Sequence, residues 1–159
     1  MSGPGAGRSP RASRDRAEPV AFWLIKSEPD AWSWDQQVAR GKAGEPWSGV
    51  RNHTAKLNLM KMKRGERAFF YHSNVGKQIV GICEVAKEAY PDPTAPEGSP
   101  WVVCDFVAVA PLTKPVTLED VKAEPKLKDM LLINNSRLSV QPVSDAEWKT
   151  VCAMGGVRP

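Results

Sequence analysis

The sequence predicts an α+β fold in which a small curved mixed β-sheet or barrel is surrounded by short helices. Five or six segments have the apolar character of strands, and short helical segments interrupt them. The connections between strands are too short for regular helical crossovers, which argues against a doubly wound sheet. With 159 residues, of which 42% are hydrophobic and 25% charged, the chain has the length and composition of one compact domain.

Residues 1–19 are rich in Gly, Pro, Ser, Arg and Ala and lack bulky apolar residues after Met1, so we expect a disordered basic tail. The ordered domain is expected to span residues 20–157. Residues 20–25 predict a buried first strand, which Pro29 stops. This apolar run is too short to cross a bilayer, and the tail lacks the apolar stretch of a secretory signal. We therefore expect a cytoplasmic monomer with no membrane partner.

The next elements follow from spacing and turn chemistry. Residues 33–41 predict a helix with Ser at its start and Gly at its end. Residues 66–72 and 78–88 predict a hairpin, because the intervening turn holds an Asn and a Gly that can adopt positive φ. A second helix is predicted between these elements, because Ala55, Leu59 and Met62 recur at helical spacing and form an apolar inward face. Gly65 is expected to end this helix.

The second half of the chain alternates loop, strand and helix. Four prolines in residues 91–100 predict a loop, and residues 101–110 predict a mostly buried central strand. The spacing of residues 117–120 predicts a capped short helix. Residues 137–141 predict the last strand, and residues 144–155 a terminal helix that opens on a capping box.

Three short segments join apolar or aromatic residues to turns rich in hydrogen-bonding groups: WLIKSEP at 23–29, WSGVRN at 47–52 and FFYHSN at 69–74. Strands supply rigid walls, strand ends supply donors and acceptors, and Trp or Tyr supplies a face on which a flat ring stacks. The segments therefore predict a pocket for a flat polar ligand. Its candidate lining residues are Lys26, Ser27, Glu28, Trp47, Ser48, Gly49, Val50, Asn52, Tyr71, Ser73 and Asn74.

The tryptophans have different expected roles. Trp47 lies at a turn, which favours partial exposure and stacking on a ligand over core packing. Trp23 lies within a buried strand and is expected in the core. Trp101 is either a second wall of the pocket or a core or rim residue. A lid or packing role is expected for the tryptophans at helix starts or on helix faces, Trp32, Trp34 and Trp148.

Strand alternation separates Tyr71 and Ser73 from His72. The first two point to one face of the strand and His72 to the other. If Tyr71 and Ser73 face the pocket, His72 is a core or hinge residue. The pattern alone leaves open which face is which.

Basic charge is concentrated beside the second motif. The net charge of the chain is +4, whereas residues 51–67 contain six Lys or Arg residues against Glu66 alone. This concentration is typical of a surface that contacts a phosphate backbone, although a solvated helix face has the same pattern. Arg51 either reaches a phosphate or pairs with a local carboxylate, and its position before the basic helix favours the phosphate. The candidate phosphate-binding residues are Arg51, Lys56, Lys61, Lys63, Arg64 and Arg137.

Six motifs occur in one order: WLIKSEP, WxGVRN, FFYHSN, GIxEV, AYPD and RLSVQP. In these motifs the chain resembles EVE domains, which belong to the PUA-like superfamily and are related to YTH domains, and it is similar to the thymocyte nuclear protein family. The resemblance covers residues 21–151. It implies a PUA-like fold and recognition of a modified base in DNA or RNA, of the 5-methylcytosine type for EVE domains and N6-methyladenine for YTH domains. It further implies that residues 26–28 bond the base edge and that residues 47 and 48 begin the aromatic cage.

Two other functional classes, an enzyme and a protein adaptor, would each require features of their own in the sequence. A hydrolase acting on modified nucleotides or nucleic acid would use His53, His72 or Cys83, but no nucleophile elbow, metal-ligand spacing or glycine-rich phosphate loop is present. The three cysteines, which include Cys104 and Cys152, are expected to be buried in a reducing compartment. A protein adaptor would need an exposed apolar stripe, and none stands out. We therefore expect a non-enzymatic reader of a modified base, without cofactor or metal.

Overall fold

The computed structural model describes residues 21–159, so the expectations for the tail at residues 1–19 and for Val20 lie outside the described residues. Two short 3-10 helices, Gly41–Ala43 and Pro125–Leu127, join longer elements. The strands and α-helices are, in chain order, β1 (Phe22–Ser27), α1 (Trp34–Arg40), β2 (Glu45–Pro46), α2 (His53–Lys61), β3 (Arg67–His72), β4 (Gln78–Pro91), β5 (Val102–Thr117), α3 (Leu118–Ala123), α4 (Leu131–Asn134), β6 (Val140–Val143) and α5 (Asp145–Met154).

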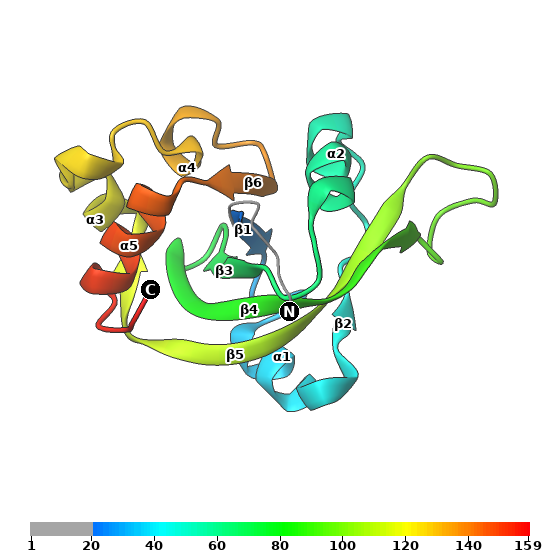
Figure 1. The fold of residues 1–159 in the computed structure, drawn as a ribbon, viewed down its shortest axis with the longest axis horizontal. Helices are drawn as coiled ribbons and strands as arrows, with labels where there is room; N and C mark the ends of the chain where they lie inside the picture. The colour runs from blue at the N-terminus through cyan, green and yellow to red at the C-terminus, as the bar shows by residue number, and fades with distance from the viewer. Residues whose placement is uncertain (1–20) are drawn as a thin grey trace, which may run out of the picture.

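The strands of the described residues form one mixed sheet in the order β2-β5-β4-β3-β1-β6. β1 runs parallel to β3, and the other neighbouring pairs are antiparallel. β4 and β5 are long and strongly bent (Figure 1), and their pairing shifts register at four places. Such irregularities increase local twist and bending. The curved mixed sheet with short surrounding helices is therefore confirmed.

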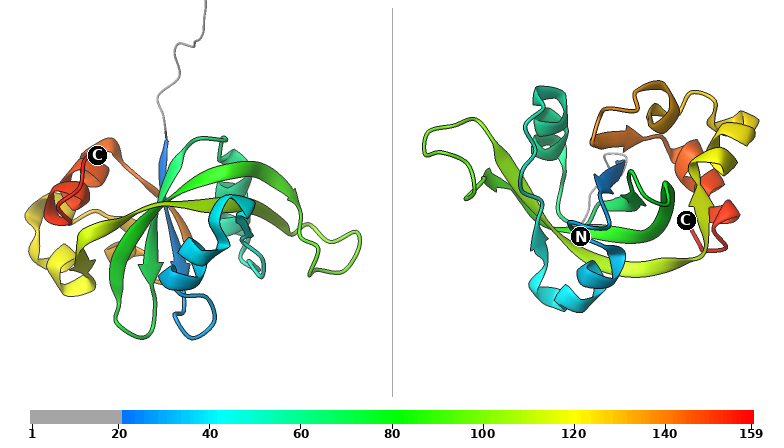
Figure 2. Two further views of the ribbon diagram at one scale, coloured as in Figure 1. Left: turned by 90° about the horizontal axis from the view of Figure 1, so that it is seen from below. Right: turned by 180° about the vertical axis from the view of Figure 1, so that it is seen from behind.

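Side-chain alternation divides the core into two clusters, one on each face of the sheet. Phe70 of β3 joins Trp23 and Trp34 in the cluster packed by α1 and α2. Its neighbour Tyr71 joins Trp148 in the cluster covered by α3, α4 and α5. Figure 2 shows α3 and α5 grouped on one side of the molecule, away from α1 and α2. The core position of Trp23 and the packing roles of Trp34 and Trp148 are confirmed.

The predicted caps are present. Ser33, Thr117 and Ser144 each form a capping box at the start of α1, α3 and α5. The hairpin turn between β3 and β4 also has the expected conformation, with Asn74 at φ 64° and Gly76 at φ 86°. One helix end was predicted wrongly, because α2 already ends at Lys61, ahead of the glycine at position 65.

Several strand boundaries differ from the prediction, and β4 continues past residue 88 to Pro91. Two other differences arise because proline is tolerated where the ladder is incomplete. The last strand is Val140–Val143 instead of residues 137–141, and it includes Pro142. β6 lies at the edge of the sheet and pairs only with β1, so a missing N–H is accommodated there. β5 likewise continues past residue 110, since Pro111 lies opposite Gly81, where the register shifts.

The three cysteines are free and buried, as predicted. Burial raises the pKa of Cys104 to about 12, helped by the nearby Asp105 and Glu88, and burial raises the pKa of Cys152 to about 11. These thiols therefore stay protonated and behave as small apolar groups. Within residues 21–159, no helix combines the length and apolar character needed to cross a membrane.

Candidate functional site

A pocket of about 360 Å³ opens where the carboxyl end of β1 faces the segment around β2. In the sheet, β1 and β2 are separated by β3, β4 and β5, so the curvature of the sheet is what brings these two segments together. The structure therefore brings the predicted residues of the first motif, 26–28, together with two predicted residues of the second motif, Trp47 and Ser48. The lining residues are Lys26, Ser27, Glu28, Ala31, Trp32, Glu45, Pro46, Trp47 and Ser48.

Trp47 forms the inner wall of the pocket. Its indole meets Phe70 edge-on with 5.7 Å between ring centroids, and it meets Phe106 in the same way at 5.6 Å. The backbone N–H of Trp47 donates to the carbonyl oxygen of Cys104 at 2.8 Å. Only 8% of Trp47 is exposed, so the expected partial exposure at a turn is wrong. The backbone bond to the β5 strand draws the ring onto the sheet.

Trp32 forms the outer wall, although the sequence interpretation assigned it a lid or packing role. Its indole N–H donates to the side-chain oxygen of Gln37 at 2.8 Å. Gln37 is fully buried, and its amide donates to the carbonyl oxygen of Phe106 at 2.9 Å. The Ser27 hydroxyl donates to the carbonyl oxygen of Trp32 at 2.5 Å. The feature of the sequence that could have identified Trp32 as a pocket residue is its position in the turn that directly follows the first motif.

The polar rim of the pocket carries one cation and two carboxylates. The ammonium of Lys26 donates to the carbonyl oxygen of Ser136 at 2.6 Å, and burial lowers the pKa of Lys26. Glu45 lies 3.5 Å from the Nε of Arg40. Burial raises the pKa of Glu45; Arg40 opposes this rise, and Asp105 adds to it. Glu28 supplies the second carboxylate, so the rim is rich in acceptors.

The residues of the third motif do not line this pocket. Tyr71, Ser73 and Asn74 line a separate hollow of about 220 Å³, which shares only Lys26 with the pocket. The prediction that these three residues line the pocket together with Trp47 is wrong. Side chains alternate along β3, so Phe70 points to the cluster that contains Trp47, and Tyr71 points to the cluster on the other face of the sheet.

His72 lies on the Trp47 side of the strand and has a structural partner. Its Nε2 accepts the backbone N–H of Trp34 at 3.1 Å. Burial lowers the pKa of His72, an effect that the nearby Asp35 opposes. The neutral imidazole therefore serves as an acceptor that holds the start of α1 against the sheet.

The remainder of the second motif also lies outside the lining. Gly49 donates its N–H to Oδ2 of Asp92 at 3.1 Å, and Val50 is buried with 7% exposure. Asn52 caps α2, since its side-chain oxygen accepts the N–H of Ala55 at 2.9 Å. These residues support the wall that carries Trp47, because their backbone follows it directly.

Arg51 pairs with the carboxylate of Asp92, which is one of the two alternatives that the sequence left open. Its Nη1 lies 3.0 Å from Oδ2 of Asp92, and its guanidinium lies 5.7 Å from the ring of Trp101. The imidazole of His53 packs on the same tryptophan with 4.8 Å between centroids. Trp101 therefore belongs to this cluster beside α2, and it does not line the pocket.

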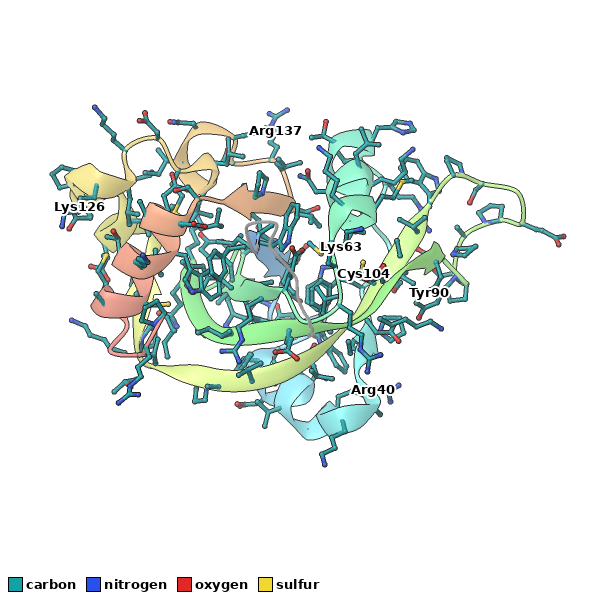
Figure 3. The ribbon with its side chains drawn as sticks, viewed as in Figure 1. Arg40, Lys63, Tyr90, Cys104, Lys126 and Arg137 are labelled. Carbon is teal, nitrogen blue, oxygen red and sulfur yellow. The ribbon has the colours of Figure 1, made fainter. Side chains whose placement is uncertain are left out.

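The basic residues predicted to contact phosphate do not form one surface around the pocket. Arg67 lies opposite Phe22, so Lys63 and Arg64 lie at the amino end of β1, whereas the pocket lies at its carboxyl end. Five residue steps of strand separate these ends by roughly 16 Å. Lys61 ends α2 on the same side, and Lys56 is half-buried along the helix. Arg137 is exposed on the side of the molecule that carries α2 and β6, while Arg40 lies on the α1 side (Figure 3).

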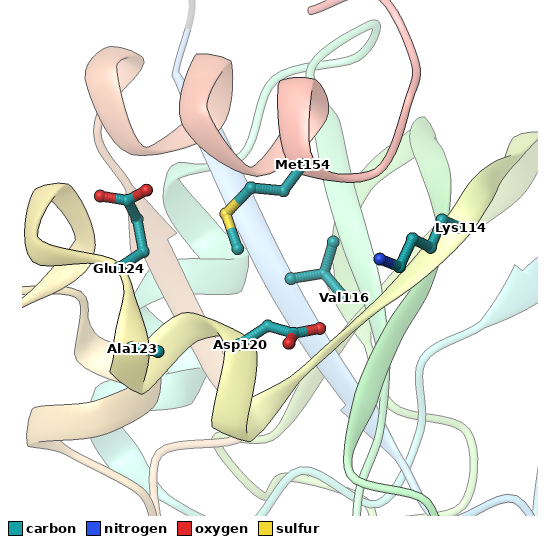
Figure 4. A pocket seen from close by; sticks show the side chains of 6 residues that line it. All are labelled: Lys114, Val116, Asp120, Ala123, Glu124 and Met154. Carbon is teal, nitrogen blue, oxygen red and sulfur yellow. The ribbon is translucent and has the colours of Figure 1, made fainter.

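A larger hollow of about 400 Å³ lies between β5, α3 and α5 (Figure 4). Its two carboxylates act as helix caps. Asp120 accepts the backbone N–H of Thr117 at 3.1 Å, and Glu124 accepts that of Lys126 at 3.0 Å. Among the residues that the structure describes, its lining contains no aromatic ring, so it offers no face for stacking.

The family profile of the EVE domain matches residues 21–154. The chain belongs to the EVE domain family. Thymocyte nuclear protein 1 of Homo sapiens is 33% identical to this EVE domain protein, covering 87% of this chain and 76% of the relative. A solved structure of a Rhodopseudomonas palustris protein superposes with a TM-score of 0.82 at 64% identity, covering 86% of this chain and 94% of that one.

Two further structures relate this EVE domain to proteins solved with nucleic acids. The crystal structure of human THYN1 protein in complex with 5-methylcytosine-containing DNA has a TM-score of 0.80 at 32% identity, and it covers 87% of this chain and 99% of that one. A YTH domain of Zygosaccharomyces rouxii, solved in complex with N6-methyladenosine RNA, has a TM-score of 0.52 at 19% identity. The second likeness concerns the fold alone, and it agrees with the curved mixed sheet and short helices described above.

Proposed function

We propose that this EVE domain is a non-enzymatic reader that binds DNA or RNA and holds one modified base, of the 5-methylcytosine type, between Trp32 and Trp47. The observation that carries the proposal is that a hollow of about 360 Å³ is lined both by two indoles, those of Trp32 and Trp47, and by polar groups at the ends of strands. This volume lies in the range of small-molecule sites. Further support comes from the similar human THYN1 protein, which was solved in complex with 5-methylcytosine-containing DNA.

The two tryptophans have different parts in the proposed pocket. Trp32 is half-buried and presents the more accessible ring, while Trp47 is held in the core and forms the rigid inner wall. A base enters such a site from a single strand or after leaving the stack of a duplex. Stacking on an indole contributes about 1–3 kcal/mol per base. The rim groups then contact the edge of the base.

The hydrolase alternative receives little support from its candidate residues. The Nε2 of His72 is occupied by the N–H of Trp34, and His53 packs on Trp101. Cys83 is buried, and its burial raises the pKa of the thiol far above its ordinary value. Within residues 21–159, no group of three or more His, Cys, Asp or Glu side chains is arranged to hold a metal.

Replacement of Trp32 tests the proposal most directly. Trp32→Ala should lower the preference for a single-stranded oligonucleotide with one 5-methylcytosine over its unmodified twin by about tenfold, because the accessible stacking face is lost. The measurement is the ratio of the two dissociation constants, with melting temperature as the folding check. Trp47→Ala is a poorer test, since removal of a buried Trp costs about 3–5 kcal/mol of stability.

Trp101→Ala is the matched control, because Trp101 is also a half-buried tryptophan but lies outside the pocket. This variant should retain the preference of the parent protein. An unchanged preference in folded Trp32→Ala would remove Trp32 from the site. A preference lost only in Trp101→Ala would place the stacking surface beside α2.

A further inference from the structure

The proposed function raises a problem of discrimination, and the inference that follows rests on that function. Thymine carries the same 5-methyl group as 5-methylcytosine on a ring of the same shape, and it is abundant in DNA. Stacking and apolar contact with the methyl group therefore separate the two bases poorly. Their edges differ: a cytosine presents an N4 amino donor where thymine presents the O4 acceptor.

Glu45 is placed to read this difference. It belongs to β2, directly before Pro46 and Trp47, and its backbone is fixed by pairing opposite Phe106 of β5. Its side chain lines the pocket and is 26% exposed, so the carboxylate is partly withdrawn from water. An ionised carboxylate accepts hydrogen bonds and donates none. Beside an amino group it gains a charge-assisted bond, whereas beside a carbonyl oxygen it is repelled.

Arg40 places a positive charge beside Glu45. The Nε of Arg40 donates to the carbonyl oxygen of Gly44 at 2.7 Å and lies 3.5 Å from Oε1 of Glu45. The guanidinium therefore favours the ionised carboxylate. Arg40 is a positioning residue in this arrangement, because the pocket lining includes Glu45 but not Arg40.

Glu28 is the other carboxylate of the rim and the competing candidate. Its carbonyl oxygen accepts the N–H groups of Ala31 and Trp32 at 2.9 Å each, which fixes its backbone in the turn. The residue as a whole is exposed to solvent. A solvated carboxylate discriminates less strongly than one that is partly buried, because water competes for the same hydrogen bond.

We propose that Glu45 determines the specificity of the pocket by accepting a hydrogen bond from the exocyclic amino group of a cytosine-type base and by repelling the O4 of thymine and uracil. Under the proposed function, the ring and its methyl group contact Trp32 and Trp47 instead. Selection for the amino edge and selection for the methyl group are therefore separable.

The variant Glu45→Gln distinguishes selection for the amino edge from selection for the methyl group. A glutamine amide matches the carboxylate in shape, but it can donate to O4 as well as accept from an amino group. Four single-stranded oligonucleotides that differ at one base, 5-methylcytosine, cytosine, thymine or uracil, are titrated against the full chain. The parent should bind the 5-methylcytosine strand at least about tenfold more tightly than the thymine strand, as expected for a direct contact to a base edge. In Glu45→Gln this ratio should approach one, while the ratio of 5-methylcytosine to cytosine stays unchanged.

Three further variants make the outcome decisive. Glu97→Gln, in the exposed loop after β4, is the charge-matched control and should keep both ratios. Glu45→Asp keeps the charge but withdraws it by one methylene, so it should also lower the discrimination against thymine. This variant replaces Glu45→Gln in the test if the Gln variant does not fold. If Glu28→Gln abolishes the discrimination and Glu45→Gln does not, the assignment to Glu45 is overturned.

The two proposals fail in different ways. A parent protein that binds 5-methylcytosine and cytosine strands equally would contradict the proposed function. A parent that prefers 5-methylcytosine over cytosine, combined with Glu45→Gln and Glu45→Asp variants that reject thymine as well as the parent does, would leave the function standing and refute the role of Glu45.

Discussion

Nη1 of Arg51 lies 3.0 Å from Oδ2 of Asp92, and the same carboxylate oxygen accepts the N–H of Gly49 at 3.1 Å. The Asp92 side chain is fully buried. Its other oxygen accepts the N–H of Thr94 at 2.7 Å and the hydroxyl of the same residue at 2.6 Å. Asp92 thus ties the segment after Trp47 to the loop that follows β4, and it positions one wall of the pocket.

Replacement of Asp92 by Asn should therefore destabilise the fold. The NH₂ group of Asn cannot accept the hydrogen bonds that one of the buried carboxylate oxygens accepts, so donors on that side lose their acceptor. We therefore expect a loss of about 3 kcal/mol in the free energy of unfolding. Urea denaturation measures this loss, with Asp129→Asn on the exposed surface as the control. A loss below about 0.5 kcal/mol, typical of surface substitutions, would show that these contacts are not cooperative.

The same carboxylate should make stability depend on acid. Burial acts to raise the pKa of Asp92, but the hydrogen bonds from Thr94, Gly49 and Arg51 outweigh it and hold the pKa at about 2. The unfolded value is about 3.9. Because the folded pKa is the lower one, the contribution of Asp92 is complete above about pH 4 and is lost as the pH falls toward 2. Stability measured across this window should fall less steeply for Asp92→Asn than for the parent. Parallel profiles would be incompatible with a depressed pKa.

Gly81 should not tolerate a side chain. A Cβ at this position would lie 2.4 Å from Cη2 of Trp34, whose indole covers the glycine. Gly81→Ala should therefore reduce stability by about 1–3 kcal/mol, as is usual for overpacked cores. The cause can be checked with Trp34→Leu, because the double variant should be more stable than the sum of the two single losses predicts. Strict additivity would mean that the indole is not the obstacle.

The basic residues at and directly after the end of α2 should contribute to the affinity for nucleic acid but not to the preference for one base. Lys61, Lys63 and Arg64 lie at the end of β1 remote from the pocket, so their replacement by Gln should weaken binding to all oligonucleotides equally. The slope of log affinity against log salt should flatten by about 0.7–0.9 per lost phosphate contact. The control is the equivalent change at Lys122 of α3 and at Lys126 and Lys128, in and directly after the 3-10 helix that follows. Figure 3 shows Lys126 on the α3 side of the molecule. Identical slopes for the α2 variant and the parent would assign these residues to a solvated helix face.

Local patterns in the sequence were enough to predict most of the fold. The capping boxes at Ser33, Thr117 and Ser144, the hairpin turn after β3, and the apolar character of β1, β3 and β4 each depend on neighbours along the chain. Such features are encoded over three to five residues and do not require knowledge of the tertiary structure. Element ends were less predictable, since Pro142 is acceptable in a strand only because β6 lies at the sheet edge.

The composition of the pocket was decided by tertiary structure. The sequence alone singled out residues 26–28 together with Trp47 and Ser48, but it also placed Tyr71 in the pocket and omitted Trp32 and Glu45. It assigned Arg51 to the phosphate backbone. Which face of β3 meets Trp47 depends on how the sheet curves, and the partner of Arg51 is a carboxylate 41 positions away in the sequence. A periodic pattern reports which residues share a face, whereas only the packed sheet determines what that face meets.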